Sequence, residues 1–106
     1  MRLAFTFHNL ESSDAIKNYA TDKIGKLQKY LHAPMDAAIT FSVERHQHCI
    51  DLSVHAGSES YLGREEQEDM YASIDLVVDK VRNQLRRAKD LHSHKRRTAT
   101  VDIPGE

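Results

Sequence analysis

The sequence predicts an α+β domain in which a four-stranded sheet carries two helices packed side by side on one face. Three observations lead to this prediction. Four short segments alternate apolar and polar side chains, two longer segments repeat apolar residues at helical spacing, and their order along the chain is β-α-β-β-β-α. Because each element has a single apolar face, stacking both helices on one side of the sheet buries all of these faces together.

The chain begins with a strand and a helix. Residues 2–8 alternate in the way that is typical of a half-buried strand. The polar residues 12–14 offer a helix N-cap, and the apolar side chains behind them recur at helical spacing, so an amphipathic helix is expected over residues 14–31. Residues 32–34, which include a proline, end it.

Three more strands are expected to follow. Residues 37–45 alternate, and the polar residues 45–48 suit a turn. Alternation resumes over residues 49–55, and Ala-Gly-Ser at positions 56–58 favours a hairpin turn. Residues 59–64 make a shorter and weaker fourth strand.

The second helix is expected to begin near residues 68–69, whose negative charges suit the positive end of a helix, and to run to about residue 90. We therefore predict one domain over residues 1–93, followed by a short flexible tail over residues 94–106 that includes Pro104.

Composition indicates a soluble protein of the cytoplasm. The chain has 106 residues and no apolar run of about 18 residues that could cross a membrane. Its single cysteine, Cys49, cannot form an internal disulfide, which fits a reducing compartment. We expect no membrane partner and a monomer when the protein is free.

Charge is divided unevenly along the chain. Residues 1–79 hold seven Lys and Arg against thirteen Asp and Glu, whereas residues 80–106 hold eight against three. A protein with a net charge of -1 that gathers its positive charge on one element presents a local patch to a polyanion. Nucleic acid is therefore the first partner to consider.

Helical spacing predicts where the cations lie. On the first helix, Lys23 and Lys26 flank the apolar stripe; on the second, basic residues lie on both flanks, with Lys80 on one and Arg82 on the other. A groove between the helices would then be positive on both walls, as phosphate binding requires. The candidate RNA-binding residues are Lys23, Lys26, Lys29, Lys80, Arg82, Arg86, Arg87 and Lys89.

Metal binding and catalysis receive less support. His46, His48, Cys49 and His55 supply the atom types of a zinc site, but not a recognised spacing. No glycine-rich phosphate loop or nucleophile elbow is present, and the acidic run at residues 65–69 suits a helix start. We therefore expect no metal, cofactor, small-molecule substrate or enzymatic activity.

The segment over residues 66–75, Glu-Gln-Glu-Asp-Met-Tyr-Ala-Ser-Ile-Asp, continues with Asp-Lys-Val at 79–81 and Gln-Leu at 84–85. It resembles the signature of bacterial ribosome hibernation factors, namely the short hibernation promoting factor and the protein Y ribosome-associated inhibitor. The first helix agrees through Lys23, through Lys26 with the leucine after it, and through Tyr30. The resemblance covers residues 1 to about 95.

The resemblance implies the same fold and a non-catalytic factor that inhibits translation. Such a factor binds 16S ribosomal RNA of the small subunit in the decoding channel and blocks the tRNA and mRNA sites. Whether it promotes or prevents ribosome dimers stays open. The resemblance also favours the Lys80 flank as a groove wall, although Asn83 departs from a position that is commonly basic. The basic positions that match are Lys23, Lys26, Lys80, Arg87 and Lys89.

Two other functional classes remain. A general double-stranded RNA-binding module is the runner-up, because its α-β-β-β-α order is contained within the order predicted here. A metal-dependent protein that uses the histidine hairpin is the third.

Overall fold

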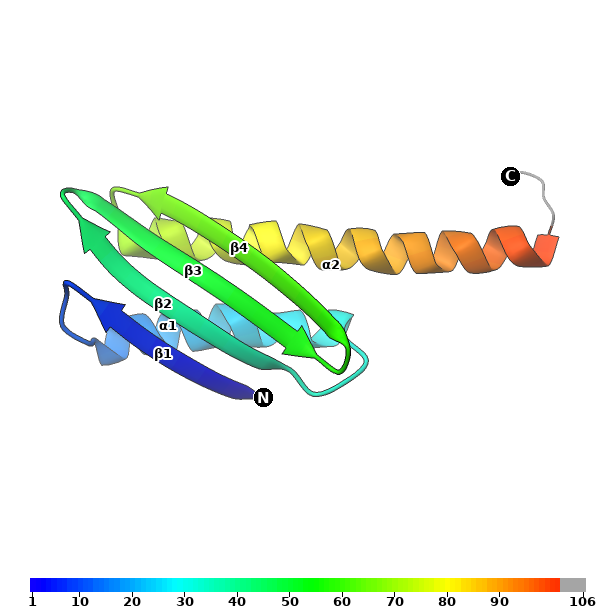
Figure 1. Ribbon diagram of the computed structural model, residues 1–106, viewed down its shortest axis with the longest axis horizontal. Helices are drawn as coiled ribbons and strands as arrows, with labels where there is room; N and C mark the ends of the chain where they lie inside the picture. The colour runs from blue at the N-terminus through cyan, green and yellow to red at the C-terminus, as the bar shows by residue number, and fades with distance from the viewer. Residues whose placement is uncertain (102–106) are drawn as a thin grey trace.

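The four strands form one sheet in the order β1-β2-β3-β4, and both helices lie behind it in the view of Figure 1. This computed structural model describes the backbone of residues 1–101 and the side chains of residues 1–89. It confirms the predicted α+β class and the order β-α-β-β-β-α. The elements are β1 (Arg2–His8), α1 (Asp14–Gly25), a 3-10 helix η1 (Lys26–Tyr30), β2 (Asp36–Glu44), β3 (Gln47–Ala56), β4 (Glu59–Gln67) and α2 (Met70–Val101).

The strand pairing combines two patterns. Strand β1 runs parallel to β2, in a register that places Phe5 beside Ile39, and the connection between them passes through α1 and η1. Strands β2, β3 and β4 form an antiparallel meander. A parallel pair needs a long crossover connection, whereas antiparallel neighbours need only a tight turn, so the chain uses its first helix where the topology requires one.

The core lies between the inner face of the sheet and the apolar stripes of the helices. Phe41 of β2 is fully buried, and its ring stacks on that of Phe7 with centroids 4.7 Å apart. Burial of these side chains is the main force that holds the helices to the sheet. The other large side chains that are almost fully buried are Ile24, Leu27, Met35, Ile39, Ile50, Leu52, Val54, Ile74, Val77, Val81 and Leu85.

The predicted helix over residues 14–31 is divided into α1 and the 3-10 helix η1. Ser13 caps α1, accepting a hydrogen bond from the Ile16 amide at 3.3 Å. The loop after η1 is held by the side chain of Gln28, which donates to the Ala33 carbonyl at 2.9 Å and accepts from the Met35 amide at 2.8 Å. One amide side chain thereby fixes the path from η1 into β2.

Strand β4 extends to Gln67, three residues beyond its predicted end. Its last residues are charged or polar and show no apolar alternation, yet each is paired with β3, as in the pair Gln67 and His48. Backbone pairing with β3 therefore extends the strand where side-chain pattern does not indicate it. Near its centre, Gly63 lets α2 approach closely, because a Cβ there would lie 3.0 Å from Val81 Cγ2 and 3.1 Å from Val77 Cγ2.

Helix α2 begins after Asp69, whose carboxylate accepts a hydrogen bond from the Ala72 amide at 3.1 Å. It continues to Val101, past the end near residue 90 that we expected, because no glycine or proline interrupts it. Figure 1 shows its C-terminal part extending beyond the sheet. Within the described part of the chain, no helix is long and apolar enough to span a membrane.

The predicted flexible tail over residues 94–106 falls partly on this helical stretch. Residues 102–106 lie outside the described residues, and so do the side chains after Lys89. The domain boundary at residue 93 therefore stays a prediction.

Candidate nucleic-acid interface

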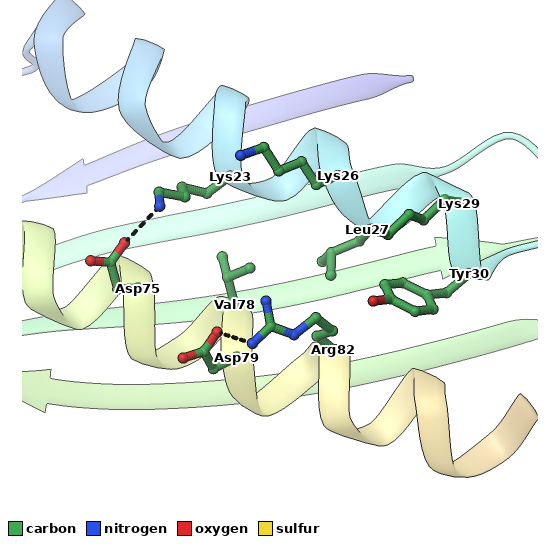
Figure 2. Close-up of a pocket in the computed structure, with 9 residues that line it drawn as sticks. All are labelled: Lys23, Lys26, Leu27, Lys29, Tyr30, Asp75, Val78, Asp79 and Arg82. Carbon is green, nitrogen blue, oxygen red and sulfur yellow. Dashed lines mark hydrogen bonds and ion pairs between the residues drawn. The ribbon is translucent and has the colours of Figure 1, made fainter. Parts of the chain in front are cut away.

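A groove of about 330 Å³ runs between the first helical segment and α2, on the side of the helices that faces away from the sheet (Figure 2). One wall comes from α1 and η1 and the other from α2, and the apolar side chains of Leu27 and Val78 lie between them. The residues that line it are Lys23, Lys26, Leu27, Lys29, Tyr30, Asp75, Val78, Asp79 and Arg82. The structure thus brings together four of the predicted RNA-binding residues.

The first wall carries three lysines. Lys23 comes from the last turn of α1, and Lys26 and Lys29 from η1. A 3-10 helix has about three residues per turn, so side chains three positions apart lie one above the other. The change from α-helix to 3-10 helix therefore aligns Lys26 with Lys29 along the groove. Lys29 Nζ also lies 5.3 Å from the centre of the Tyr30 ring, a cation–π contact.

The second wall combines one cation with two carboxylates, all from α2. Arg82 donates from Nη2 to Asp79 Oδ1 at 2.6 Å. Asp75 lies one turn before Asp79 and faces Lys23 across the groove, with 3.7 Å between Lys23 Nζ and Asp75 Oδ1. Both ion pairs are drawn in Figure 2. Among the described residues, Lys26 and Lys29 form no ion pair with a carboxylate.

A small network at one end of the groove connects the two helices. The Tyr19 hydroxyl donates to Asp75 Oδ1 at 2.7 Å, and Lys23 Nζ lies 5.4 Å from the centre of the Tyr19 ring. The Tyr19 ring also meets the Tyr71 ring edge to face, with centroids 4.9 Å apart. The hydrogen bond to Asp75 raises the pKa of Tyr19 above its ordinary value. Asp75 thereby contacts a tyrosine and a lysine of α1 at once and helps to set the position of the two walls.

Our prediction that the Lys80 flank forms the second wall is wrong. Lys80 Nζ donates to the Arg64 carbonyl at 2.8 Å and lies 2.6 Å from Glu65 Oε2. Gln84, one turn later, donates from Nε2 to the Leu62 carbonyl at 2.8 Å. This flank of α2 therefore faces β4, which is an edge strand with carbonyls available to accept, and the Arg82 flank faces α1.

The three remaining candidates do not line the groove. Arg86, Arg87 and Lys89 are not buried, and they lie further along α2 than the groove extends. Counting along α2, Arg86 and Lys89 share the flank of Arg82, whereas Arg87 shares the flank of Lys80. The Arg82 flank thus continues the positive wall past the groove, toward the part of α2 that leaves the sheet.

Sequence reasoning did not identify Asp75 and Asp79 as groove residues. The signal was present in the sequence. Asp75 lies seven residues before Arg82, and Asp79 lies three residues before it, and residues at these spacings share one flank of a helix. A count of acids over whole segments of the chain hides them, because it does not separate the flanks of a helix.

The histidine and cysteine set is spread over the β2–β3 hairpin. His55 is exposed on the open face of the sheet, where Ser53 and Ser60 lie 2.8 and 3.0 Å from its two ring nitrogens. Cys49 is buried, and burial raises the pKa of its thiol. Within the described residues, no group of three His, Cys, Asp or Glu side chains could hold a metal ion.

Comparison with known proteins gives a consistent result. Residues 3–93 match the family model described as Sigma 54 modulation protein / S30EA ribosomal protein. The chain is 34% identical over 90 residues to the ribosome hibernation promoting factor of Salmonella typhimurium, covering 85% of this chain and 95% of that one. The Escherichia coli K12 protein of the same name is 32% identical, with the same coverage of both chains.

Solved structures are similar as well. The N-terminal domain of Protein Y from Thermus thermophilus matches with a TM-score of 0.76 and 28% identity, covering 82% of this chain and 98% of that one. A ribosomal subunit interface protein from Coxiella burnetii matches with a TM-score of 0.75 over 85% of this chain and 99% of that one. At 20% identity, this second match supports the fold alone.

Proposed function

The chain belongs to the Sigma 54 modulation protein / S30EA ribosomal protein family, and we propose that it is a non-catalytic ribosome hibernation factor that inhibits translation. The observation that carries the proposal is the groove between α1–η1 and α2, with four cations on its two walls. Relatives that are 32–34% identical over most of their length are named ribosome hibernation promoting factors. Such a protein would act in the cytoplasm, where ribosomes are.

The proposed ligand is the phosphate backbone of 16S ribosomal RNA in the small subunit. Lys26 and Lys29 are the leading contacts, because both line the groove, lie in line on η1 and have no carboxylate partner among the described residues. Neutralising phosphates with such side chains releases counter-ions from the RNA, which makes binding strong at low salt and weak at high salt. Lys23 and Arg82 are each paired with a carboxylate, so we give them a smaller part in this contact.

The proposed mechanism is steric. A folded domain whose groove holds the RNA backbone of the decoding channel would occupy the space that tRNA and mRNA need, without any chemical step. Arg86 and Lys89 would extend the contact along α2. Lys80 and Arg87 are predicted contacts too, but they lie on the β4 flank, so we give them a smaller part.

Sedimentation through sucrose gradients tests the proposal. The protein is mixed with separated small and large ribosomal subunits at a series of salt concentrations. We expect co-sedimentation with the small subunit, little with the large one, and release as the salt concentration rises. The same gradients, run with whole ribosomes, report whether dimers form or are prevented.

A competition experiment separates this function from that of a general double-stranded RNA module. An excess of plain RNA duplex is added to the complex with the small subunit. A dedicated ribosome factor stays bound, whereas equal displacement by duplex and by free small subunits would favour the general module. Absence of binding to either would overturn the proposal altogether.

A further inference from the structure

The positive groove contains two carboxylates that the proposed phosphate contacts do not need. Asp75 and Asp79 lie one turn apart on α2 and both line the groove, and each is paired with a groove cation. Their side chains are about half exposed, 47% for Asp75 and 50% for Asp79, so an incoming RNA would meet them directly. Together they lower the formal charge of the groove from +4 to +2.

The two carboxylates divide the groove into unequal parts. At Lys23 and at Arg82 a phosphate must displace or approach a carboxylate, which repels it. At Lys26 and Lys29 no carboxylate is paired with the lysine among the described residues, so a phosphate has no carboxylate to displace. The groove therefore favours RNA whose phosphates come closest at Lys26 and Lys29 over RNA whose phosphates come closest at Lys23 or Arg82.

We propose that Asp75 and Asp79 are specificity-determining residues that weaken binding to RNA in general and so favour an RNA surface whose phosphates lie over Lys26 and Lys29. This inference rests on the proposed function. Non-specific binding of RNA is almost wholly electrostatic and has no required geometry, so it rises with any added positive charge. A repulsive element reduces this background more than it reduces binding of an RNA whose phosphates avoid it.

The substitutions Asp75→Asn and Asp79→Asn test this role. Each removes one negative charge. In Asp75→Asn the side-chain amide oxygen can still accept the hydrogen bond from Tyr19, so the contact between the helices is kept. Asp22→Asn is the matched control, because Asp22 is exposed on α1, does not line the groove and makes no ion pair with another described residue. It makes the same change in net charge.

The affinities of the wild type and of each variant are measured for two ligands, the small ribosomal subunit and an RNA duplex of unrelated sequence. We expect each groove variant to bind the unrelated duplex about threefold to tenfold tighter, the size of one charge interaction at a protein surface. The salt dependence of that binding should also steepen, by up to about 0.9 in the slope of log affinity against log salt. Binding to the small subunit should change by less than about twofold. The control should raise duplex binding by less than the groove variants do, because Asp22 lies outside the groove.

Two results would overturn the inference. In one, the groove variants bind the unrelated duplex no more tightly than Asp22→Asn does. In the other, both ligands gain equally, so that the ratio of affinities is unchanged. Failure of the proposed function is a separate result, because it appears in the wild type as absence of salt-dependent binding to the small subunit.

Discussion

Two double substitutions that remove the same charge should have unequal effects on RNA binding. Lys26→Gln/Lys29→Gln removes two cations from the groove that have no carboxylate partner among the described residues. Lys80→Gln/Arg87→Gln removes two from the opposite flank of α2, where Lys80 is already bonded to the Arg64 carbonyl and to Glu65. Both pairs are predicted RNA contacts from the sequence, but only the first lines the groove. The comparison therefore tests which surface binds RNA.

The expected size follows from the number of phosphates that are neutralised. Each contact contributes about 0.7 to 0.9 to the slope of log affinity against log salt. Loss of two contacts should lower the slope by about 1.4 to 1.8, so that a rise from about 50 to about 200 mM salt weakens the wild type roughly sevenfold to twelvefold more than the groove variant. The β4-flank variant should change the slope by less than about 0.7, the value of one contact.

The assay is a binding titration with purified small subunits at four or five salt concentrations. The urea midpoint of unfolding is measured first for every variant. A midpoint close to that of the wild type shows that the fold is intact, so that a change in binding reports the loss of an RNA contact. An equal or larger change of slope in the Lys80→Gln/Arg87→Gln variant would refute the reasoning. The RNA surface would then run along the β4 side of α2, as the family resemblance first implied.

Three further predictions concern the frame that holds the groove. Gly63→Ala should lower the free energy of unfolding by about 1–3 kcal/mol, measured by urea denaturation. The added Cβ would press on two valine side chains of α2, each of which has one strongly preferred rotamer in a helix. Unchanged stability would contradict this prediction. Ser73→Ala should lower the free energy of unfolding by about 1–2 kcal/mol in the same assay. Ser73 is fully buried, and its hydroxyl donates to the His48 carbonyl at 2.6 Å. A decrease below about 0.5 kcal/mol would mean that this carbonyl finds another hydrogen-bond donor. The hydrogen bond to Glu59 raises the pKa of Tyr61 to about 12, so the stabilising effect of this bond should be complete below pH 10 and be lost as the pH rises from about 10 to about 12; ultraviolet titration of the phenolates should show a late-titrating group that is missing in Tyr61→Phe.

Most of the fold could be predicted because alternating and helical patterns report burial directly. Strands β1, β2 and β3 each show one apolar face, and the two helices show one stripe each. The end of β4 could not be predicted, because its last residues are extended by pairing with β3 rather than by burial of apolar side chains. The close contact at Gly63 is also invisible in sequence, because it depends on how near α2 lies to the sheet.

The site could be predicted in composition but not in orientation. A helical wheel separates Lys80 from Arg82, yet it cannot say which flank meets the neighbouring helix. That choice depends on the strand order and on the direction in which α2 crosses the sheet, with β4 beneath one flank and α1 beside the other. Both are properties of the assembled fold. Carrying positions over from the family resemblance favoured the Lys80 flank as the groove wall, whereas Arg82 lines the groove. A match of residue type contains no information about the direction in which a helix flank faces.

Residues 66–75, which carry the family resemblance, mainly fix the position of α2. Asp69 caps its first turn, and Ser73 fastens it to the backbone of β3. The Tyr71 ring packs edge to face against the Tyr19 ring of α1, and Asp75 accepts a hydrogen bond from the Tyr19 hydroxyl. The apolar residues of the run, Met70 and Ile74, are buried in the core.

The frame of the groove and its charge are therefore encoded by different residues. The cations Lys26 and Lys29 on one wall, and Arg82 with Arg86 and Lys89 on the other, all lie outside the run that positions α2. Surface cations can be exchanged or shifted by a turn at small cost in folding free energy, whereas a change at Ser73 or Asp75 alters the contacts of α2 with the sheet or with α1. A chain can thus keep the recognisable motif and still change the charges on the surface of α2, as the uncharged Asn83 does here. For this reason the motif predicts the fold and the existence of the groove, while affinity for a particular RNA has to be judged from the charges on its walls.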